Sequence, residues 1–179
     1  MKRLKADLGC VFRLLLTLAL LCCVVRPAAA ATTTDQPTPT PCPGLLPSET
    51  QCFTGKSSAG APFFIAMPKT WNQNLILFAH GGPRLGAPKL AETIEDLERF
   101  QMMVSEGYAW AGTTYRRGGY GVRSAAEDMD QLRTLTWQHF GRPRRTILHG
   151  QSYGGSVASK GAELYATVDG PNGPVKGPY

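Results

Sequence analysis

Residues 146–155 read TILHGQSYGG, and this stretch decides which fold the chain can adopt. The short apolar run over 146–149 predicts a strand, and the helical spacing of apolar residues over 153–167 predicts a helix directly after it. Between the two lies the pattern Gly-x-Ser-x-Gly, with Ser152 at its centre. We therefore predict that Ser152 lies on a sharp turn between a strand and a helix.

Gly150 and Gly154 stand two positions before and after Ser152. A sharp strand-to-helix turn forces the serine into strained backbone angles, and only glycines at these positions let neighbouring chain pass closely enough. The Ser152 hydroxyl would then be exposed at the carboxyl end of the strand, with a helix N-terminus behind it that favours developing negative charge. The pattern predicts a catalytic nucleophile, and the alternative is an ordinary glycine-rich turn with an incidental serine.

A second glycine-rich loop, His-Gly-Gly-Pro at residues 80–83, follows a predicted strand over Leu75–Ala79. A glycine pair in this position can aim a backbone N–H into a pocket, as the oxyanion hole of such an enzyme requires. Proline has no N–H, so the donor is one of the two glycines, and we favour Gly82. The amide of Tyr153 is the second predicted donor.

The spacing of apolar residues predicts the other helices and strands, and glycine or proline residues predict where they end. Further strands are predicted over Phe63–Met67 and Tyr108–Tyr115, with helices over 90–104, stopped by Gly107, and from a Ser124–Glu127 capping box to about His139. Strands that alternate with crossover helices predict an α/β fold with a mostly parallel sheet. From Asp169 onward the sequence predicts a turn-rich tail without another strand.

The first 30 residues predict a secretory signal peptide. A positively charged start precedes an apolar run over Leu14–Val25 and the small residues Ala28–Ala31, with cleavage expected after Ala30. The protein is therefore expected to be secreted or periplasmic, without a stable membrane span after cleavage. An uncleaved anchor is the alternative, although the apolar run is shorter than the ~20 residues of a spanning helix. Cys22 and Cys23 leave a lipoprotein as a weaker alternative.

The rest of the chain divides into a linker and a domain. Residues 31–50 hold six Thr and five Pro, which predicts a stiff, extended and solvated linker. Residues 51–179 are expected to form the N-terminal part of an α/β domain. Because single-domain α/β enzymes commonly have roughly 200 residues or more, we expect this domain to be truncated after the helix that follows Ser152.

Composition and charge exclude some classes of protein. With 42% hydrophobic and 18% charged residues, the chain is too apolar to be intrinsically disordered. Residues 1–30 hold five Lys or Arg against one Asp and so carry +4 of the net charge of +6. The sharpest basic cluster outside them, Arg142, Arg144 and Arg145, is too short to predict a nucleic-acid partner. No His or Cys cluster has metal-ligand spacing, so neither metal nor organic cofactor is expected.

Two cysteines, Cys42 and Cys52, remain after the expected cleavage. In an exported chain such a pair suggests one disulfide, which would close a short loop and tie the linker to the domain edge. Spacing does not decide the geometry, so two unpaired thiols are an equal alternative at this stage.

These motifs resemble the α/β-hydrolase superfamily, and within it the branch of prolyl iminopeptidases and tripeptidyl aminopeptidases. The resemblance covers about residues 61–168 and rests on LILFAHGGP over 75–83, GQSYGG over 150–155 and TYRRGGY over 114–120, which is followed by a helix with Glu127 and Asp128. It differs at Arg84, where that branch often has glycine. The resemblance implies an α/β-hydrolase fold and a small ester or peptide substrate.

The histidines depart from the pattern that the resemblance implies. In this superfamily the triad runs Ser, then Asp or Glu, then His along the chain, whereas His80, His139 and His149 all precede Ser152. We prefer a structural role for each of them. The expected protein is an exported serine hydrolase whose triad acid and histidine are absent, so that this chain is inactive. The alternative is a non-catalytic exported module that binds a partner with an inert Ser152.

Overall fold

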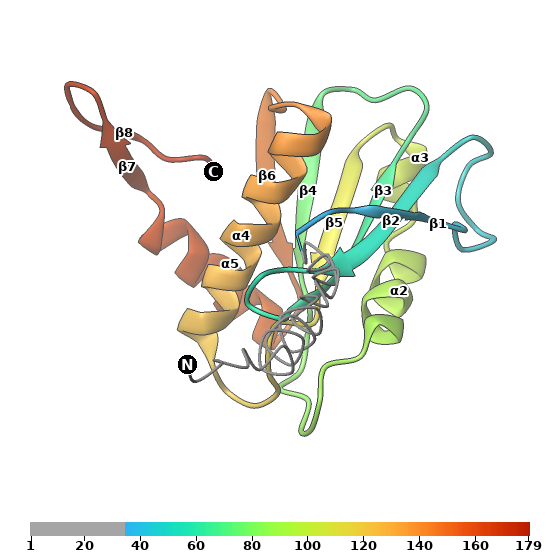
Figure 1. Cartoon of the computed structure of the whole chain (residues 1–179), viewed down its shortest axis with the longest axis horizontal. Coiled ribbons are helices and arrows are strands. Elements are labelled where there is room, and N and C mark those ends of the chain that lie inside the picture. The colour runs from blue at the N-terminus through green and yellow to red at the C-terminus, as the bar shows by residue number, and fades with distance from the viewer. Residues whose placement is uncertain (1–34) are drawn as a thin grey trace, which may run out of the picture. The chain divides into compact units, whose positions relative to one another are not determined.

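The computed structural model describes residues 35–179, which belong to a compact unit over Thr33–Tyr179 (Figure 1). The expected signal peptide and its cleavage after Ala30 lie outside the described residues. Six strands form one sheet in the order β1-β2-β3-β5-β4-β6. Their bounds are β1 Thr38–Thr40, β2 Gln51–Lys56, β3 Pro62–Met67, β4 Asn74–Ala79, β5 Ala109–Thr113 and β6 Arg145–Gly150.

Helices cover both faces of this sheet, and a small hairpin follows them (Figure 1). The described helices are α2 Leu90–Arg99, α3 Met102–Ser105, α4 Val122–Phe140 and α5 Tyr153–Leu164, and the hairpin strands are β7 Thr167–Gly170 and β8 Gly173–Lys176. In the part of the chain that the structure describes, no helix has the length and apolar character needed to cross a membrane.

The period-two pattern of the strands creates two separate cores. In β4, Leu75 and Leu77 point to the side that packs against α4 and α5, whereas Ile76 and Phe78 point to the side that packs against α2 and α3. All four side chains are buried. The central strands are therefore apolar on both faces, as expected for strands covered by helices on either side.

The predicted mostly parallel sheet is wrong. Only β4–β5 and β4–β6 pair in parallel, whereas β1–β2, β2–β3 and β3–β5 are antiparallel. The difference arises before β4: β1 and β2 already pair antiparallel, and a tight turn at residues 57–60 then reverses the chain between β2 and β3, where the Gly60 amide donates to the Ser57 carbonyl at 2.8 Å. Crossover helices therefore join strands only from β4 onward, and the sheet is mixed.

Several element boundaries also differ from the predictions. The helix expected over 90–104 is interrupted at Phe100, whose φ of −112° leaves the helical range. The capping box is wrong, because α4 begins at Val122 and the Ser124 hydroxyl donates to the preceding Gly121 carbonyl at 2.9 Å. The helix after Ser152 ends at Leu164 rather than Thr167.

Strands also occur in the expected linker and in the C-terminal segment, and the sequence predicts no further strand in the second of these. β1 lies inside residues 31–50 and pairs with β2 at one edge of the sheet, which suits a proline-rich strand because its other side needs no partner. The segment after α5 forms the β7–β8 hairpin instead of a tail without strands. The strands predicted at β3, β4, β5 and β6 are confirmed within two residues at each end.

Candidate active site

Ser152 lies in the turn between β6 and α5, in the predicted strand–turn–helix context. Its φ of 56° and ψ of −124° are rare for any residue but glycine. The side chain is exposed. A serine held in an unfavourable backbone conformation and open to solvent is the arrangement that a nucleophile on such a turn requires.

Close backbone packing explains both glycines of the motif. A Cβ at Gly150 would overlap the carbonyl of Gly154. A Cβ at Gly154 would overlap the carbonyl of Ala79 and lie 2.9 Å from the carbonyl oxygen of His80. The turn therefore presses directly against the end of β4, and this contact brings Ser152 to the loop over 80–83.

The glycine pair after β4 lies against the Ser152 turn. A Cβ at Gly81 would lie 2.9 Å from the carbonyl oxygen of Gln151, and Gly82 has a φ of 76° that favours glycine. The hydroxyl of Tyr115 donates to the His80 carbonyl at 2.8 Å and fixes the start of this loop. The loop is thus held from two sides, by β4 and by Tyr115.

A cavity of about 240 Å³ lies at this junction. Ser152 and Gly82 both line it, together with Phe78, His80, Gly81, Arg84, Glu95, Asp96, Arg99 and Gln151. Most of these residues are polar or charged, so the cavity suits a small polar group. Tyr153 faces a narrower space that Gly82 also lines, and its backbone amide begins α5, where no helical carbonyl is available to it.

The buried His80 is held between carboxylates. Its Nδ1 lies 2.5 Å from Oδ2 of Asp96, and its Nε2 lies 3.9 Å from Oε2 of Glu92. The side chains of His80 and Asp96 are only 6% and 8% exposed. Among the described residues, Nε2 has no hydrogen-bond partner. The structure thus places an oriented Asp–His pair in the cavity that Ser152 lines.

The other two histidines lie outside this cavity. His139 is exposed in the last turn of α4. His149 packs its ring 5.2 Å from that of Phe78 and 5.1 Å from that of Phe100. The structural roles expected of them stay predictions.

An ion pair between the buried Asp128 and the partly exposed Arg116 supports the segment that precedes α4. Asp128 accepts hydrogen bonds from the Arg116 amide at 2.8 Å and from its Nε at 2.6 Å. Burial raises the pKa of Asp128, while its hydrogen bonds to Arg116 act in the opposite direction. The pair anchors the chain just after Tyr115, whose pKa burial raises well above the ordinary value.

Two residues that contact His80, Asp96 and Tyr115, were not predicted from the sequence. Asp96 lies on α2, 16 positions after the histidine it contacts, and no local pattern marks the pairing. Tyr115 lies inside the quoted TYRRGGY segment, but its φ of 67° and the direction of its hydroxyl depend on how β5 ends.

The remaining predictions concern a disulfide and metal binding. Cys42 and Cys52 form a disulfide, with their Cα atoms 5.2 Å apart, which resolves the alternatives left by their spacing. Among residues 35–179, no group of three or more His, Cys, Asp or Glu side chains is arranged to hold a metal ion.

Comparison of the sequence with models of known protein families and with curated proteins found no match.

Proposed function

We propose that this protein is an exported serine hydrolase in which Ser152 is the nucleophile. The observation that carries the proposal is the strained backbone of Ser152 at the β6–α5 turn, pressed against the end of β4. Strain of this kind persists where the surrounding structure enforces it, and it is concentrated at functional turns. The resemblance of the motifs around residues 80–83 and 150–155 to serine hydrolases supports the same proposal.

In the proposed reaction, the Ser152 oxygen attacks the carbonyl carbon of an ester or amide and forms a tetrahedral intermediate. The amides of Gly82 and Tyr153 donate to the oxyanion, and the N-terminus of α5 adds a favourable dipole. The proton of the Ser152 hydroxyl passes to solvent water, and the leaving group takes up a proton from solvent as it departs. A water molecule then attacks the acyl carbon and releases the acid from Ser152. The small polar cavity favours a short acyl group with polar substituents.

Proton transfer limits the expected rate. The Ser152 hydroxyl must give up its proton, and no histidine among residues 35–179 is hydrogen-bonded to Ser152. In serine proteases, sites without a complete triad still accelerate acyl transfer roughly 10³-fold over water, through the oxyanion hole and binding. We therefore expect slow acylation confined to Ser152.

A fluorophosphonate probe tests the proposal. The purified protein is incubated with the probe, and adducts are located by mass spectrometry of the intact chain and its peptides. We expect one slow adduct at Ser152, none in Ser152→Ala, and unchanged labelling in Ser156→Ala, which alters an exposed serine one turn further along α5. Equal labelling of all three proteins would show that Ser152 has no special reactivity.

A further inference from the structure

A second cavity, of about 490 Å³, lies between the loop that joins α4 to β6 and the C-terminal residues. Its lining contains four cationic side chains, those of Arg142, Arg144, Arg145 and Lys176, and no carboxylate side chain. All four are exposed, and within the described part of the chain none forms an ion pair. The cavity therefore gathers four positive charges that no acidic side chain of its lining compensates.

The arginine-bearing wall is held in place by the fold. Pro143 is buried between two exposed arginines, and the Arg144 amide donates to the Gln73 carbonyl at 2.7 Å. The Arg142 guanidinium lies 4.8 Å from the centre of the Trp137 ring, in a cation–π contact. The loop backbone and one guanidinium are thus positioned before any ligand arrives, which reduces the entropy lost on binding.

The opposite wall is anchored as well. The Gly177 amide donates to the Ala166 carbonyl at 2.8 Å, and the Tyr179 hydroxyl donates to Oδ1 of Asp130 at 2.9 Å. Burial raises the pKa of Tyr179, so this hydroxyl keeps its proton at neutral pH. Asp130 is itself neutralised by two hydrogen bonds from Arg133, at 2.6 and 3.1 Å, and so does not compensate the cavity.

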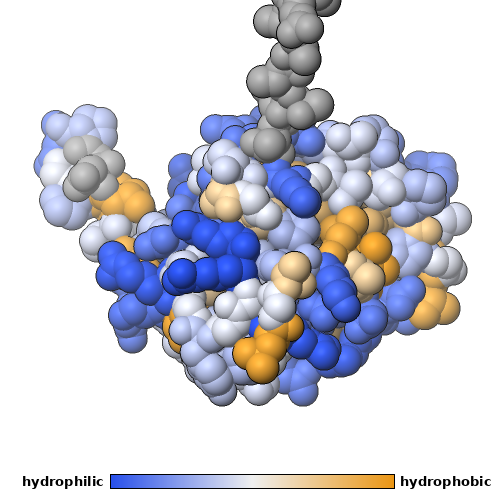
Figure 2. Space-filling view, turned by 60° about the horizontal axis from the view of Figure 1, so that its bottom comes forward, coloured by the Kyte–Doolittle hydropathy of each residue, from blue (hydrophilic) through white to orange (hydrophobic). Residues whose placement is uncertain are grey.

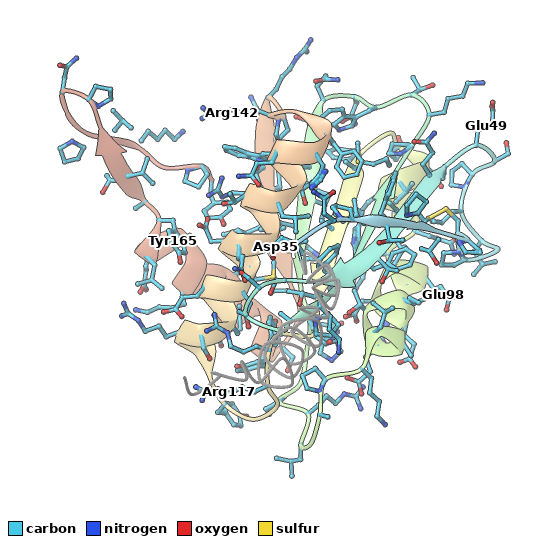
Figure 3. The ribbon with its side chains drawn as sticks, in the orientation of Figure 1. Asp35, Glu49, Glu98, Arg117, Arg142 and Tyr165 are labelled. Carbon is cyan, nitrogen blue, oxygen red and sulfur yellow. A yellow bond between two sulfur atoms is a disulfide. The ribbon has the colours of Figure 1, made fainter. Side chains whose placement is uncertain are left out.

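This cavity is separate from the one at Ser152. Arg145 begins β6, whereas Ser152 follows its last residue. The five residue steps from Arg145 to Gly150, at about 3.3 Å each, span roughly 16 Å. In Figure 3, Arg142 lies near one end of α4 and Arg117 near the other.

We propose that this cavity binds a ligand that carries several phosphate groups. Three of the four cations are arginines, whose planar fork matches phosphate oxygens in a bidentate manner. A phosphate monoester carries about −1.5 to −2 at neutral pH, so two or three such groups balance the four charges, whereas each carboxylate or phosphodiester headgroup supplies only one. The phosphates belong either to a soluble oligophosphate or to the headgroups of an anionic lipid surface.

The experiment uses inorganic tripolyphosphate and the 179-residue protein in isothermal titration calorimetry at two salt concentrations. The test variant is Arg144→Gln with Arg145→Gln. The matched control is Lys56→Gln with Arg123→Gln, which removes the same charge from exposed positions outside the cavity. In parallel, all three proteins are sedimented with phosphatidylglycerol vesicles and with neutral phosphatidylcholine vesicles, and thermal melting checks that each is folded.

We expect saturable binding that weakens with salt, about tenfold lower affinity in the test variant, and a change below twofold in the control. If phosphatidylglycerol vesicles bind in this variant-dependent manner and tripolyphosphate does not, the phosphates are those of lipid headgroups. Should the test variant fail to fold, Lys176→Gln on the hairpin is expected to weaken binding severalfold. Absence of saturable binding to either probe, or equal weakening by test and control, overturns the proposal.

Discussion

At the scale of single residues, the backbone is unusual at two positions near the loop over 80–83. Ser152 and Tyr115 both have positive φ angles although neither is glycine. In this conformation the Tyr115 hydroxyl donates a hydrogen bond to the His80 carbonyl. The Tyr115 amide donates a hydrogen bond to the Thr113 hydroxyl at 3.0 Å. A residue outside both glycine motifs thus supports the loop that carries the predicted oxyanion donor.

Gly154→Ala is expected to destabilise the protein strongly and to slow labelling of Ser152. The added methyl group would overlap the backbone of Ala79 and press on that of His80, and neither carbonyl can move without disturbing β4. The matched control is Gly155→Ala, because a Cβ there meets its nearest neighbour, the Gly150 carbonyl oxygen, at 3.6 Å.

The control should be neutral or stabilising by up to about 1 kcal/mol, since alanine favours the helix more than glycine does. Both variants are compared by urea denaturation and by the rate of fluorophosphonate labelling. Normal folding and labelling of Gly154→Ala would contradict the packing of the turn against β4.

Some of these residues could be predicted from sequence and others could not, for a physical reason. The turn at Ser152 could be predicted because its two glycines stand within two positions of the serine, although the contact that requires Gly154 is with the distant backbone of Ala79 and His80. The contact of His80 with Asp96 depends instead on where α2 docks against the sheet. Docking depends on the packing of Leu97 and Val104 with distant strand residues, which no local pattern reveals.

At the scale of elements, the error in the fold class has one source. From β4 onward, strands and helices alternate, and the parallel pairing that this alternation predicts is present in β4–β5 and β4–β6. Before β4, the chain contains hairpin connections, and the signal for the β2–β3 turn, Ser57 to Gly60, is short and weak in composition. Antiparallel strands extend one edge of the sheet for this reason.

Loss of the Cys42–Cys52 disulfide is expected to lower the free energy of unfolding by about 2–4 kcal/mol, because the bond restricts the unfolded chain. Cys52 lies on β2 and is buried in the core on the α2 side of the sheet. The measurement is urea denaturation with and without a thiol reductant. Reductant should lower the urea concentration at the midpoint of unfolding for the natural sequence. It should leave the midpoint of the double variant Cys42→Ala, Cys52→Ala unchanged. Equal midpoints for the oxidised and reduced natural protein would show that the disulfide contributes nothing to stability.

At the scale of the whole molecule, the two cavities for which we propose functions lie near opposite ends of one strand, β6. β6 carries the arginine cluster at its amino end and leads into Ser152 at its carboxyl end. On the face shown in Figure 2, hydrophobic residues occur in separate patches among hydrophilic ones rather than as one continuous area. A ligand that binds this face would therefore meet mainly polar and charged side chains.

Buried tyrosines make the stability of the molecule sensitive to alkaline pH. Burial raises the pKa of Tyr115 and Tyr179 well above the ordinary value, and burial also raises the pKa of Tyr153 and Tyr165. In the unfolded chain these phenols ionise near pH 10. Their contribution to stability is therefore complete below about pH 10 and is lost as the pH rises toward the folded-state pKa.

We expect the free energy of unfolding, measured by urea denaturation at pH 9, 10 and 11, to fall once the pH exceeds about 10. A single phenol that ionises only in the unfolded state contributes a slope of about 1.4 kcal/mol per pH unit. Tyr115→Phe should lower stability below pH 10, because the bond to the His80 carbonyl is lost, and it should make the slope above pH 10 shallower, so that its deficit narrows at pH 11. Tyr120→Phe, at a ring that is 81% exposed, is the matched control and should leave the slope as it is. If Tyr115→Phe keeps the slope of the natural sequence, the Tyr115 hydroxyl ionises in the folded protein as readily as in the unfolded chain. That result would contradict the buried hydrogen bond from this hydroxyl to the His80 carbonyl.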